Sequence, residues 1–447
     1  MEQKKVRVGF ARADITPVES VPLRGYGNTS RRMSGPVLSP LYATCMAFSD
    51  GENTVLLYTM DMTGMGGCCD ATLRPAIAEA TGIPVNNIHL SCSHNHSAPD
   101  LDNKSIPSIP RYTKQLEAKL VLAAVDALQD LAYTRIFAGS VETEGLNFVR
   151  RYVREDGTYC GDNYGSGSTA PIACHESEAD RMLQLVYFIR EGKKNVILAN
   201  FQGHPHRLGG GVNPTITSDI VGFFRDELER RTDCLVAYAT GGSGNQNSHS
   251  RIPEEMAAKR ASDHGKILAD YAVMVFRRMK EVSAEGVAAT TMDLEMPVNH
   301  SLDHMVEQAE EIRKIWAETS DNKLCAEKGL PYGINSPYHA TAIISKAKQP
   351  ATFSFSIHAL KVGGIGIAVA PYEMFDTSGM QIKEGSPFDL TVVATCANSG
   401  QGYVPSLLGW EHGGYSCDTT RFCPGSGEEM AEHYLDLLNQ LHAHKGE

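Results

Sequence analysis

The chain has 447 residues, of which 42% are hydrophobic, and this is enough to bury a large core in one or two domains. Its 41 Lys and Arg residues are outnumbered by 53 Asp and Glu residues, which gives a formal net charge of -12. No basic run is present that could neutralise phosphates, so the sequence argues against nucleic-acid partners and against stable association with anionic membranes.

The N-terminus and the cysteines bear on where the protein works. The chain begins Met1-Glu2-Gln3-Lys4-Lys5 and then enters a predicted strand over Val6 to Phe10, without the apolar core of a secretory signal. No segment has the unbroken apolar length of a membrane span. The 11 cysteines form no Cys-x-x-Cys motif, which favours reduced packing residues over a disulfide frame or a thiolate zinc site. We therefore expect a cytoplasmic protein.

The first part of the chain alternates between strand and helix patterns. Strands are predicted over Tyr42 to Phe48 and Thr54 to Thr59, and a helix over Thr72 to Thr81, with Thr72 as its N-cap. The next strand, Ile88 to Leu90, follows this helix. A strand, helix, strand order indicates a crossover connection and a sheet that is at least partly parallel.

A pair of histidines lies directly after this strand, in the stretch Ser91 to Asp100. On an extended backbone, residues two apart point to the same side, so His94 and His96 should project together from the strand end. Two imidazoles on one side invite a metal ion. An isolated His-x-His pair can also be a strand-capping residue beside a surface residue, and the choice depends on the rest of the chain.

Two further strands deliver polar residues to their ends. Leu183 to Ile189 and Asn195 to Asn200 are predicted to form a hairpin, whose second strand runs into Phe201-Gln202-Gly203-His204-Pro205-His206. The strand over Cys234 to Ala239 ends in the Gly-rich stretch Thr240 to Ser248, where backbone N–H groups could face a ligand and Asn247 or a serine could add a donor. Open α/β sheets build their sites at strand ends.

The remaining elements are predicted from hydrophobic spacing and turn residues. Glu373 is expected in the first turn of a helix that ends near Lys383, where an acidic residue usually serves only the helix dipole. A Gly-rich loop is expected over Leu23 to Gly27. The other predicted helices are Tyr112 to Leu131, Pro253 to Val282, Ser301 to Thr319 and one that extends to Arg231 from an N-terminus at Thr217-Ser218-Asp219. The other predicted strands are Ile136 to Ser140, Ala351 to Leu360, Gly364 to Ala370 and Leu390 to Ala397.

The predicted strand ends together carry a set of metal-binding side chains. Two imidazoles with one carboxylate form a common catalytic zinc set, and such sites leave a position for water or substrate. The pattern therefore indicates a zinc site. The candidate groups are His94, His96, His204, the Asn247 loop, Glu373 and Tyr403.

A series of short motifs runs in one order along nearly the whole chain. It comprises Gly9-Phe10-Ala11-Arg12-Ala13-Asp14-Ile15-Thr16-Pro17, His94-Asn95-His96-Ser97-Ala98-Pro99, Gly203-His204-Pro205, Ser218-Asp219, Ala370-Pro371-Tyr372-Glu373, Gly402-Tyr403-Val404-Pro405 and Gly413-Gly414-Tyr415. In this order the motifs resemble the neutral/alkaline non-lysosomal ceramidase family, in its N-terminal catalytic domain. The resemblance implies an α/β fold of mixed β-sheets flanked by helices, with residues 1–447 as a single large catalytic domain.

The resemblance also implies roles for particular residues. Zinc would be held by His94, His204, Glu373 and Tyr403. His96 would lie beside the metal as a proton-transfer or substrate-polarising residue, and Arg150 and Tyr415 would contact the substrate.

The sequence departs from the family at three points. The family's Gly-Asp-Val-Ser-Pro segment is here Gly244-Asn245-Gln246-Asn247-Ser248, so Asn247 occupies the serine position, and an amide is not a nucleophile under ordinary conditions. The family's C-terminal β-sandwich domain and export signal are expected to be absent. The loops are rich in Gly, Asn and Arg, which does not indicate a long apolar groove for acyl chains.

These observations predict a zinc-dependent hydrolase that acts on a C–N amide or related carbonyl bond in a small polar substrate. Three alternatives stay open: a true ceramidase, a zinc-dependent lyase or isomerase, and a zinc-binding sensor that lost catalysis with the serine. An amidohydrolase barrel also begins with His-x-His at a strand end, but it needs a regular eightfold strand and helix alternation that the predicted hairpins do not provide.

Overall fold

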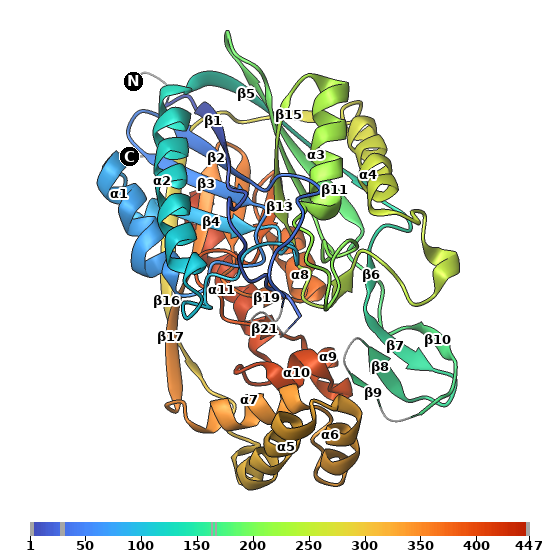
Figure 1. Ribbon diagram of the computed structural model, residues 1–447. Coiled ribbons are helices and arrows are strands. Elements are labelled where there is room, and N and C mark those ends of the chain that lie inside the picture. Colours follow the sequence, from blue (N-terminus) through green and yellow to red (C-terminus); the bar gives the residue numbers. More distant parts are fainter. Residues whose placement is uncertain (1–3, 27–31, 162–163, 166–167, 444–447) are drawn as a thin grey trace.

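Two β-sheets packed face to face form the centre of the molecule, between two layers of helices (Figure 1). This computed structural model describes residues 4–26, 32–161, 164–165 and 168–443. The mixed α/β fold expected from the sequence is confirmed.

The larger sheet has the strand order β13-β12-β11-β5-β1-β2-β3-β4, with β15 paired to β5. Strands β11 and β12 are antiparallel, as the predicted hairpin requires, and β3 and β4 are parallel, as the predicted crossover requires. Its strands are β1 (Arg7–Asp14), β2 (Tyr42–Ser49), β3 (Thr54–Met60), β4 (Ile88–Cys92), β5 (Ala132–Glu142), β11 (Met182–Arg190), β12 (Val196–Phe201), β13 (Leu235–Thr240) and β15 (Lys280–Val282).

The smaller sheet packs on one face of the larger sheet, in the order β16-β17-β18-β20. Because successive side chains of a strand point to opposite faces, Val196 and Leu198 of β12 lie between the sheets, whereas Ile197 and Ala199 pack toward the helices outside. The strands are β16 (Val287–Pro297), β17 (Thr352–Val362), β18 (Ile365–Val369) and β20 (Leu390–Ala394).

Helices cover the outer faces of both sheets. Helices α1 and α2 pack on one half of the larger sheet, α3 and α4 on the other half, and α8 and α11 on the smaller sheet. In the described ranges, no helix is both long and apolar enough to cross a membrane. Their bounds are α1 (Arg74–Thr81), α2 (Ser108–Gln129), α3 (Asp219–Thr232), α4 (Ala261–Val275), α8 (Asp376–Gly385), α9 (Leu407–His412), α10 (Tyr415–Thr419) and α11 (Ser426–Ala443).

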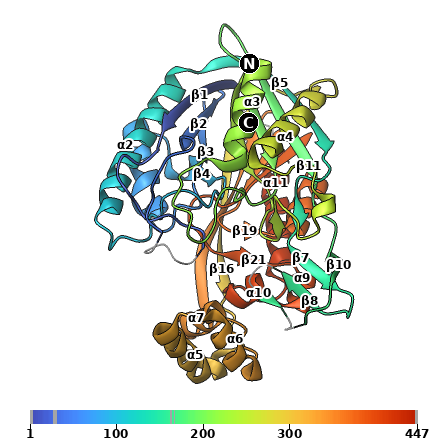
Figure 2. The same ribbon diagram turned by 45° about the vertical axis from the view of Figure 1, so that its right-hand side comes forward.

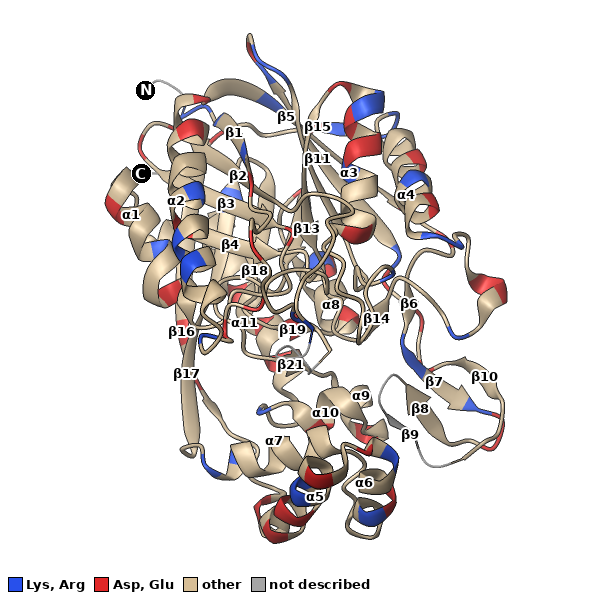
Figure 3. Ribbon diagram, in the orientation of Figure 1, with Lys and Arg blue, Asp and Glu red and all other residues tan. Residues whose placement is uncertain are grey.

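A helical lobe is inserted between β16 and β17, and Figure 2 shows it beyond the ends of these strands, beside α10. It comprises α5 (Val306–Thr319), α6 (Asn322–Gly329) and α7 (Pro337–Ala347) around a small core of its own. Lys and Arg positions are interspersed with Asp and Glu positions along α3, α4 and α5 (Figure 3).

Short strands complete the fold near the sheet ends. Four of them form two pairs with two residues per strand, β6 with β14 and β19 with β21. Their bounds are β6 (Phe148–Val149), β7 (Arg151–Arg154), β8 (Tyr159–Gly161), β9 (Tyr164–Gly165), β10 (Ile172–His175), β14 (Gln246–Asn247), β19 (Glu373–Met374) and β21 (Tyr403–Val404).

Two predicted helices are present as α4 and α8, but their predicted ends are wrong in ways that matter for the architecture. The helix over Pro253 to Val282 is instead a short turn of 3-10 helix, α4 and the edge strand β15, whose Val282 pairs with Ile136. Glu373 does not begin a helix, because it pairs with Tyr403 and α8 begins three residues later. In both places, pairing with a distant strand overrides the local helical pattern.

The start of the α1 segment also differs from the prediction. Helical turns begin at Cys69, and Thr72 lies inside them, where its hydroxyl donates to the Cys68 carbonyl oxygen (2.8 Å). The helix over Ser301 to Thr319 begins later than predicted, at Val306. Strand β16 and the helices α6, α7, α9, α10 and α11 were not predicted.

The buried imidazole of His264 in α4 should make the fold sensitive to acid. Its side chain is fully buried, and burial together with Arg207 lowers its pKa from 6.5 to about 3. The unfolded chain therefore takes up the proton first, so the stabilisation by the neutral ring is complete above about pH 6.5 and falls as the pH drops toward 3.

We expect His264→Leu to reduce the acid-induced loss of unfolding free energy by roughly 1 kcal/mol per pH unit between pH 6 and pH 5. Urea unfolding at both pH values measures it, with the exposed His304→Leu as the control. Equal pH slopes in the wild type and His264→Leu would contradict the prediction.

Candidate metal centre

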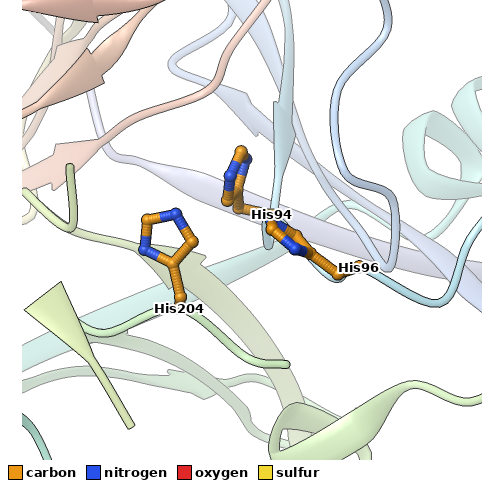
Figure 4. Close-up of side chains that lie close together, drawn as sticks. All are labelled: His94, His96 and His204. Carbon is orange, nitrogen blue, oxygen red and sulfur yellow. The ribbon is translucent and has the colours of Figure 1, made fainter. Parts of the chain in front are cut away.

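His94 and His96 reach the centre from a tight loop. The prediction of an extended backbone at this pair is wrong. Strand β4 ends at Cys92, and His94 has a left-handed backbone with φ +65°. The loop is held by Asn95, whose N–H donates to the Met62 carbonyl (3.2 Å) and whose side chain donates to the Thr217 carbonyl (2.6 Å). The two rings still lie together, with centroids 4.9 Å apart (Figure 4).

His204 approaches from the end of β12, beyond a turn at Gly203, whose φ of +124° favours glycine. It forms a bridge with Asn247, and its backbone N–H donates to the Gln246 carbonyl oxygen (3.1 Å). The ring centroid of His204 lies 4.6 Å from that of His94 and 5.5 Å from that of His96. The chain therefore brings all three imidazoles together, as Figure 4 shows.

The three buried histidines and the half-buried Glu373 form one cluster. Each imidazole offers a ligand nitrogen within 4.8 Å of the other two. The Glu373 carboxylate oxygen Oε2 lies 3.2 Å from His94 Nε2 and 3.4 Å from His204 Nε2. This geometry allows two ligand sets for one metal ion, either the three histidines or His94 and His204 with Glu373.

The hydrogen bonds of two rings decide which nitrogen faces the centre. His94 Nδ1 lies 2.9 Å from the Thr63 carbonyl and His204 Nδ1 lies 2.9 Å from the Gln246 carbonyl. Because a carbonyl oxygen only accepts, both Nδ1 atoms carry the hydrogen and both Nε2 atoms of the neutral rings present a lone pair to Glu373. Facing lone pairs repel unless a cation or a proton lies among them.

Two of these facing atoms indicate that the cluster could hold a metal ion. His204 Nε2 and Glu373 Oε2 are buried, and within the described ranges neither makes a hydrogen bond. Imidazoles that donate Nδ1–H to backbone carbonyls are oriented as metal-bound histidines are. The donor set of nitrogen and carboxylate oxygen suits zinc, so the residues present fit the ion that the sequence predicts.

The electrostatics of the cluster favour one positive charge inside it. Burial and the neighbouring Arg150 and His94 lower the pKa of His204 to about 4. At His94 burial is outweighed by the Cys396 thiol and the Glu373 carboxylate, which raise its pKa well above the ordinary value. At Glu373 burial is outweighed by the two imidazoles, which lower the pKa of its carboxyl group well below the ordinary value.

His96 differs from the other two imidazoles in its surroundings. Burial and the neighbouring rings of His94, His206 and His204 lower its pKa well below the ordinary value, so the ring is neutral at pH 7. Its Nδ1 is buried without a hydrogen bond in the described part of the chain. Gly25 packs against this ring, and a Cβ there would lie 2.6 Å from His96 Cγ. The predicted loop over Leu23 to Gly27 thus reaches the centre, although Gly27 lies outside the described residues.

Glu373 and Tyr403 come from different segments and meet as paired residues of β19 and β21. The Glu373 N–H donates to the Gly402 carbonyl (2.8 Å), which fixes the pair. Arg150 donates to the Tyr403 hydroxyl oxygen (3.1 Å), and burial and the nearby Glu373 raise the pKa of Tyr403 well above its ordinary value. Tyr415 lies beside Tyr403, with ring centroids 5.8 Å apart. The ligand role of Tyr403 and the substrate contacts of Arg150 and Tyr415 stay predictions.

Asn247 lies next to His204, on the short strand β14 that pairs with β6. It is buried, and so are its neighbours Asn245 and Gln246. The Gly-rich loop therefore reaches the histidine cluster, while the function of the Asn247 amide stays a prediction.

Sequence reasoning missed His206 as a member of the cluster. Its ring centroid lies 5.2 Å from that of His96 and 5.6 Å from that of His204, and its Nδ1 is buried. The signal was present, because His204 and His206 repeat the His-x-His spacing of the first pair. Four imidazoles therefore surround the centre.

A small cavity of about 110 Å³ opens onto the cluster. Its wall includes His94, Glu373, Arg24, Cys396 and Asn398. Arg24 forms ion pairs with Asp100 (3.3 Å) and with Asp102. The space beside the candidate metal ligands is thus small, and charged and polar side chains form part of its wall.

Gly244 is required where the loop after β13 packs against the backbone of β19. A Cβ there would lie 2.6 Å from the Glu373 carbonyl oxygen, and the Gly244 N–H donates to the Met374 carbonyl (2.7 Å). We expect Gly244→Ala to lower the unfolding free energy by about 1–3 kcal/mol through this overlap. Denaturant unfolding measures the change, with Gly67→Ala as the control, because nothing lies within 4 Å of a Cβ at Gly67. Equal stability of the two variants would contradict the prediction.

Comparison with known proteins identifies the fold. No protein-family model and no curated protein matches the chain. The solved structure of neutral ceramidase from Pseudomonas aeruginosa superposes with a TM-score of 0.71, over 98% of this chain and 74% of that chain, at 15% sequence identity. The chain has the fold of neutral ceramidase. A structure of a ceramidase complexed with C2 also superposes with a TM-score of 0.71, over 98% of this chain and 75% of that chain, at 15% identity.

The ceramidase fold confirms the resemblance seen in the motifs at the level of structure. At 15% sequence identity, this superposition shows a shared fold and carries no further conclusion about activity.

Proposed function

We propose that the chain is a zinc-dependent hydrolase that cleaves a C–N amide bond, or a related carbonyl bond, in a small polar substrate. The observation that carries the proposal is the convergence of His94 Nε2 and His204 Nε2 on Glu373 Oε2, at 3.2 and 3.4 Å, in a buried site. The ceramidase fold and the narrow cavity of about 110 Å³ support it.

The metal would be held by His94, His204, Glu373 and Tyr403. Bound zinc polarises a substrate carbonyl and lowers the pKa of a coordinated water from about 15.7 toward about 7. Arg150 supports Tyr403 as the fourth ligand. Its guanidinium donates to the Tyr403 hydroxyl oxygen and favours the ionised phenol, which burial disfavours.

His96 and Asn247 would handle the proton and the developing negative charge. The neutral His96 ring can take up a proton at Nδ1, which makes no hydrogen bond among the described residues, and pass it to the leaving nitrogen. The Asn247 amide and the backbone N–H groups of its loop would stabilise the oxyanion of the tetrahedral intermediate. Asn247 has no nucleophilic role in this scheme.

Metal analysis followed by product analysis tests the proposal. We expect protein purified without added metal to contain zinc or to bind it, and chelation to abolish cleavage of short N-acyl amides. In heavy-oxygen water, hydrolysis must place solvent oxygen in the carboxyl product, whereas a lyase or isomerase need not incorporate it. Protein that contains no zinc, binds none and is indifferent to chelators would rule out the metal site.

True ceramidase activity is the second candidate, favoured by the shared fold with neutral ceramidase. Two observations argue against it: Asn247 stands where the ceramidase family has serine, and the cavity at the cluster is small. Cleavage of an N-acyl sphingosine in detergent, compared with cleavage of short N-acyl amides, decides between the two substrates.

A further inference from the structure

A buried carboxylate, Asp376, lies behind the candidate metal centre at the start of α8. Its side chain has no exposed surface, and among the described residues both carboxylate oxygens accept hydrogen bonds from N–H groups alone. Oδ1 accepts from the Asn245 side chain (2.6 Å) and the Thr377 backbone (2.8 Å). Oδ2 accepts from the Gln246 side chain (2.7 Å) and the Asp180 backbone (3.2 Å). A group that accepts from so many donors has little freedom to move.

The bonds of Asp376 run to the loop that orients His204. The Gln246 side chain donates to Asp376, while its backbone carbonyl accepts from both the backbone N–H and Nδ1–H of His204. The Asn147 side chain also donates to Gln246 Oε1 (2.5 Å). The orientation of the His204 ring is therefore coupled to Asp376 through a single residue.

The same carboxylate ties this loop to the segment that carries Glu373. Asp376 follows β19 by two residues, and its backbone N–H donates to Asn245 Oδ1 (3.0 Å), which closes a two-way link between the segments. Gly244 N–H donates to the Met374 carbonyl in parallel (2.7 Å). His204 follows β12 of the larger sheet and Glu373 lies in the chain between β18 and β20 of the smaller sheet, so these bonds fix the two ligand groups relative to each other.

We infer that Asp376 is a positioning residue of the metal centre, which holds the His204 ring and the Glu373 carboxylate in register through Asn245 and Gln246. Asn245 and Gln246 are the residues that stand where the ceramidase family has Asp-Val, so the amide side chains that bind Asp376 belong to the segment in which this chain departs from that family. The inference rests on the proposed metal site and adds a residue that neither the motifs nor the ligand geometry identified.

The test is the affinity of the full-length, metal-free chain for zinc, measured by competition with a chromophoric chelator. We expect Asp376→Asn to weaken zinc binding roughly 10- to 100-fold, as is usual when a group that orients a ligand is lost, because an amide NH₂ would face N–H donors. We also expect the visible absorption bands of the cobalt-substituted protein to shift, which reports ligand geometry directly and which a general loss of stability does not produce.

Asp130→Asn is the matched control. Asp130 also accepts several hydrogen bonds, from the Phe10 backbone (3.0 Å), from Lys193 (2.7 Å) and from Arg190. Arg190 ends β11, which is antiparallel to β12, so Asp130 lies at the opposite end of the sheet from His204. This variant should bind zinc as the wild type does.

The outcomes separate this inference from the proposed function. Zinc affinity of Asp376→Asn within twofold of the wild type, or an equal loss in Asp130→Asn, overturns the inference and leaves the metal site standing. If Asp376→Asn does not fold, Gln246→Met decides, since it removes the side-chain bonds of Gln246 to Asp376 and Asn147 and keeps the backbone carbonyl that accepts from His204. Weakened zinc binding then supports the inference, and unchanged binding overturns it. A wild-type protein that binds no zinc contradicts the proposed function itself.

Discussion

Replacing His204 with alanine is expected to weaken zinc binding roughly 100- to 1,000-fold. Four-ligand zinc sites bind with about 10–16 kcal/mol, so one ligand in four is worth roughly 3–4 kcal/mol, and each 1.4 kcal/mol is a factor of ten. The reason for choosing His204 is its geometry, with Nδ1 held by the Gln246 carbonyl and Nε2 3.4 Å from Glu373. Chelator competition on the metal-free protein measures the change.

The control for this variant is His264→Ala. His264 is also fully buried, but it lies in α4 and outside the histidine cluster. The His264→Ala variant should bind zinc with wild-type affinity even if it and His204→Ala both lose stability. Wild-type zinc affinity in His204→Ala would show that His204 is not a ligand.

Replacing His96 with glutamine is expected to separate catalysis from metal binding. If His96 moves protons and is not a ligand, zinc affinity should stay close to that of the wild type, while turnover of the short N-acyl amide that the wild type cleaves fastest should fall about 10²- to 10⁴-fold. The physical basis is that the His96 ring is neutral, because burial and three neighbouring imidazoles lower its pKa below the ordinary value. Zinc titration and steady-state kinetics on the same preparation measure both quantities.

The opposite result would identify the other ligand set that the geometry allows. A loss of zinc affinity as large as that in His204→Ala would make His96 a ligand, and the centre would be formed by three histidines. His264→Gln again controls for the removal of a buried imidazole and should leave turnover unchanged.

Local sequence predicted the elements whose patterns depend on near neighbours. The hairpin of β11 and β12 follows from two apolar strand patterns around the turn at Glu191-Gly192-Lys193-Lys194, and it carries His204 to the end of β12. The crossover from β3 to β4 was predicted for the same reason, and it places His94 and His96 just beyond the end of β4. Where a segment pairs with a distant one, as β15 does with β5, local periodicity predicted the wrong element.

By itself, the sequence determined the class of the fold and most of the members of the candidate site, because strand patterns and His spacings are local properties of the chain. Only the tertiary structure decided how the histidines converge, since the left-handed backbone of His94 depends on contacts with Met62 and Thr63. Glu373, predicted in a helix, lies in a strand paired with Tyr403, and Asp376 contacts the loop that contains Asn245. Each of these contacts joins residues that are 30 or more positions apart, and a pattern read along the chain does not encode which distant residues will meet.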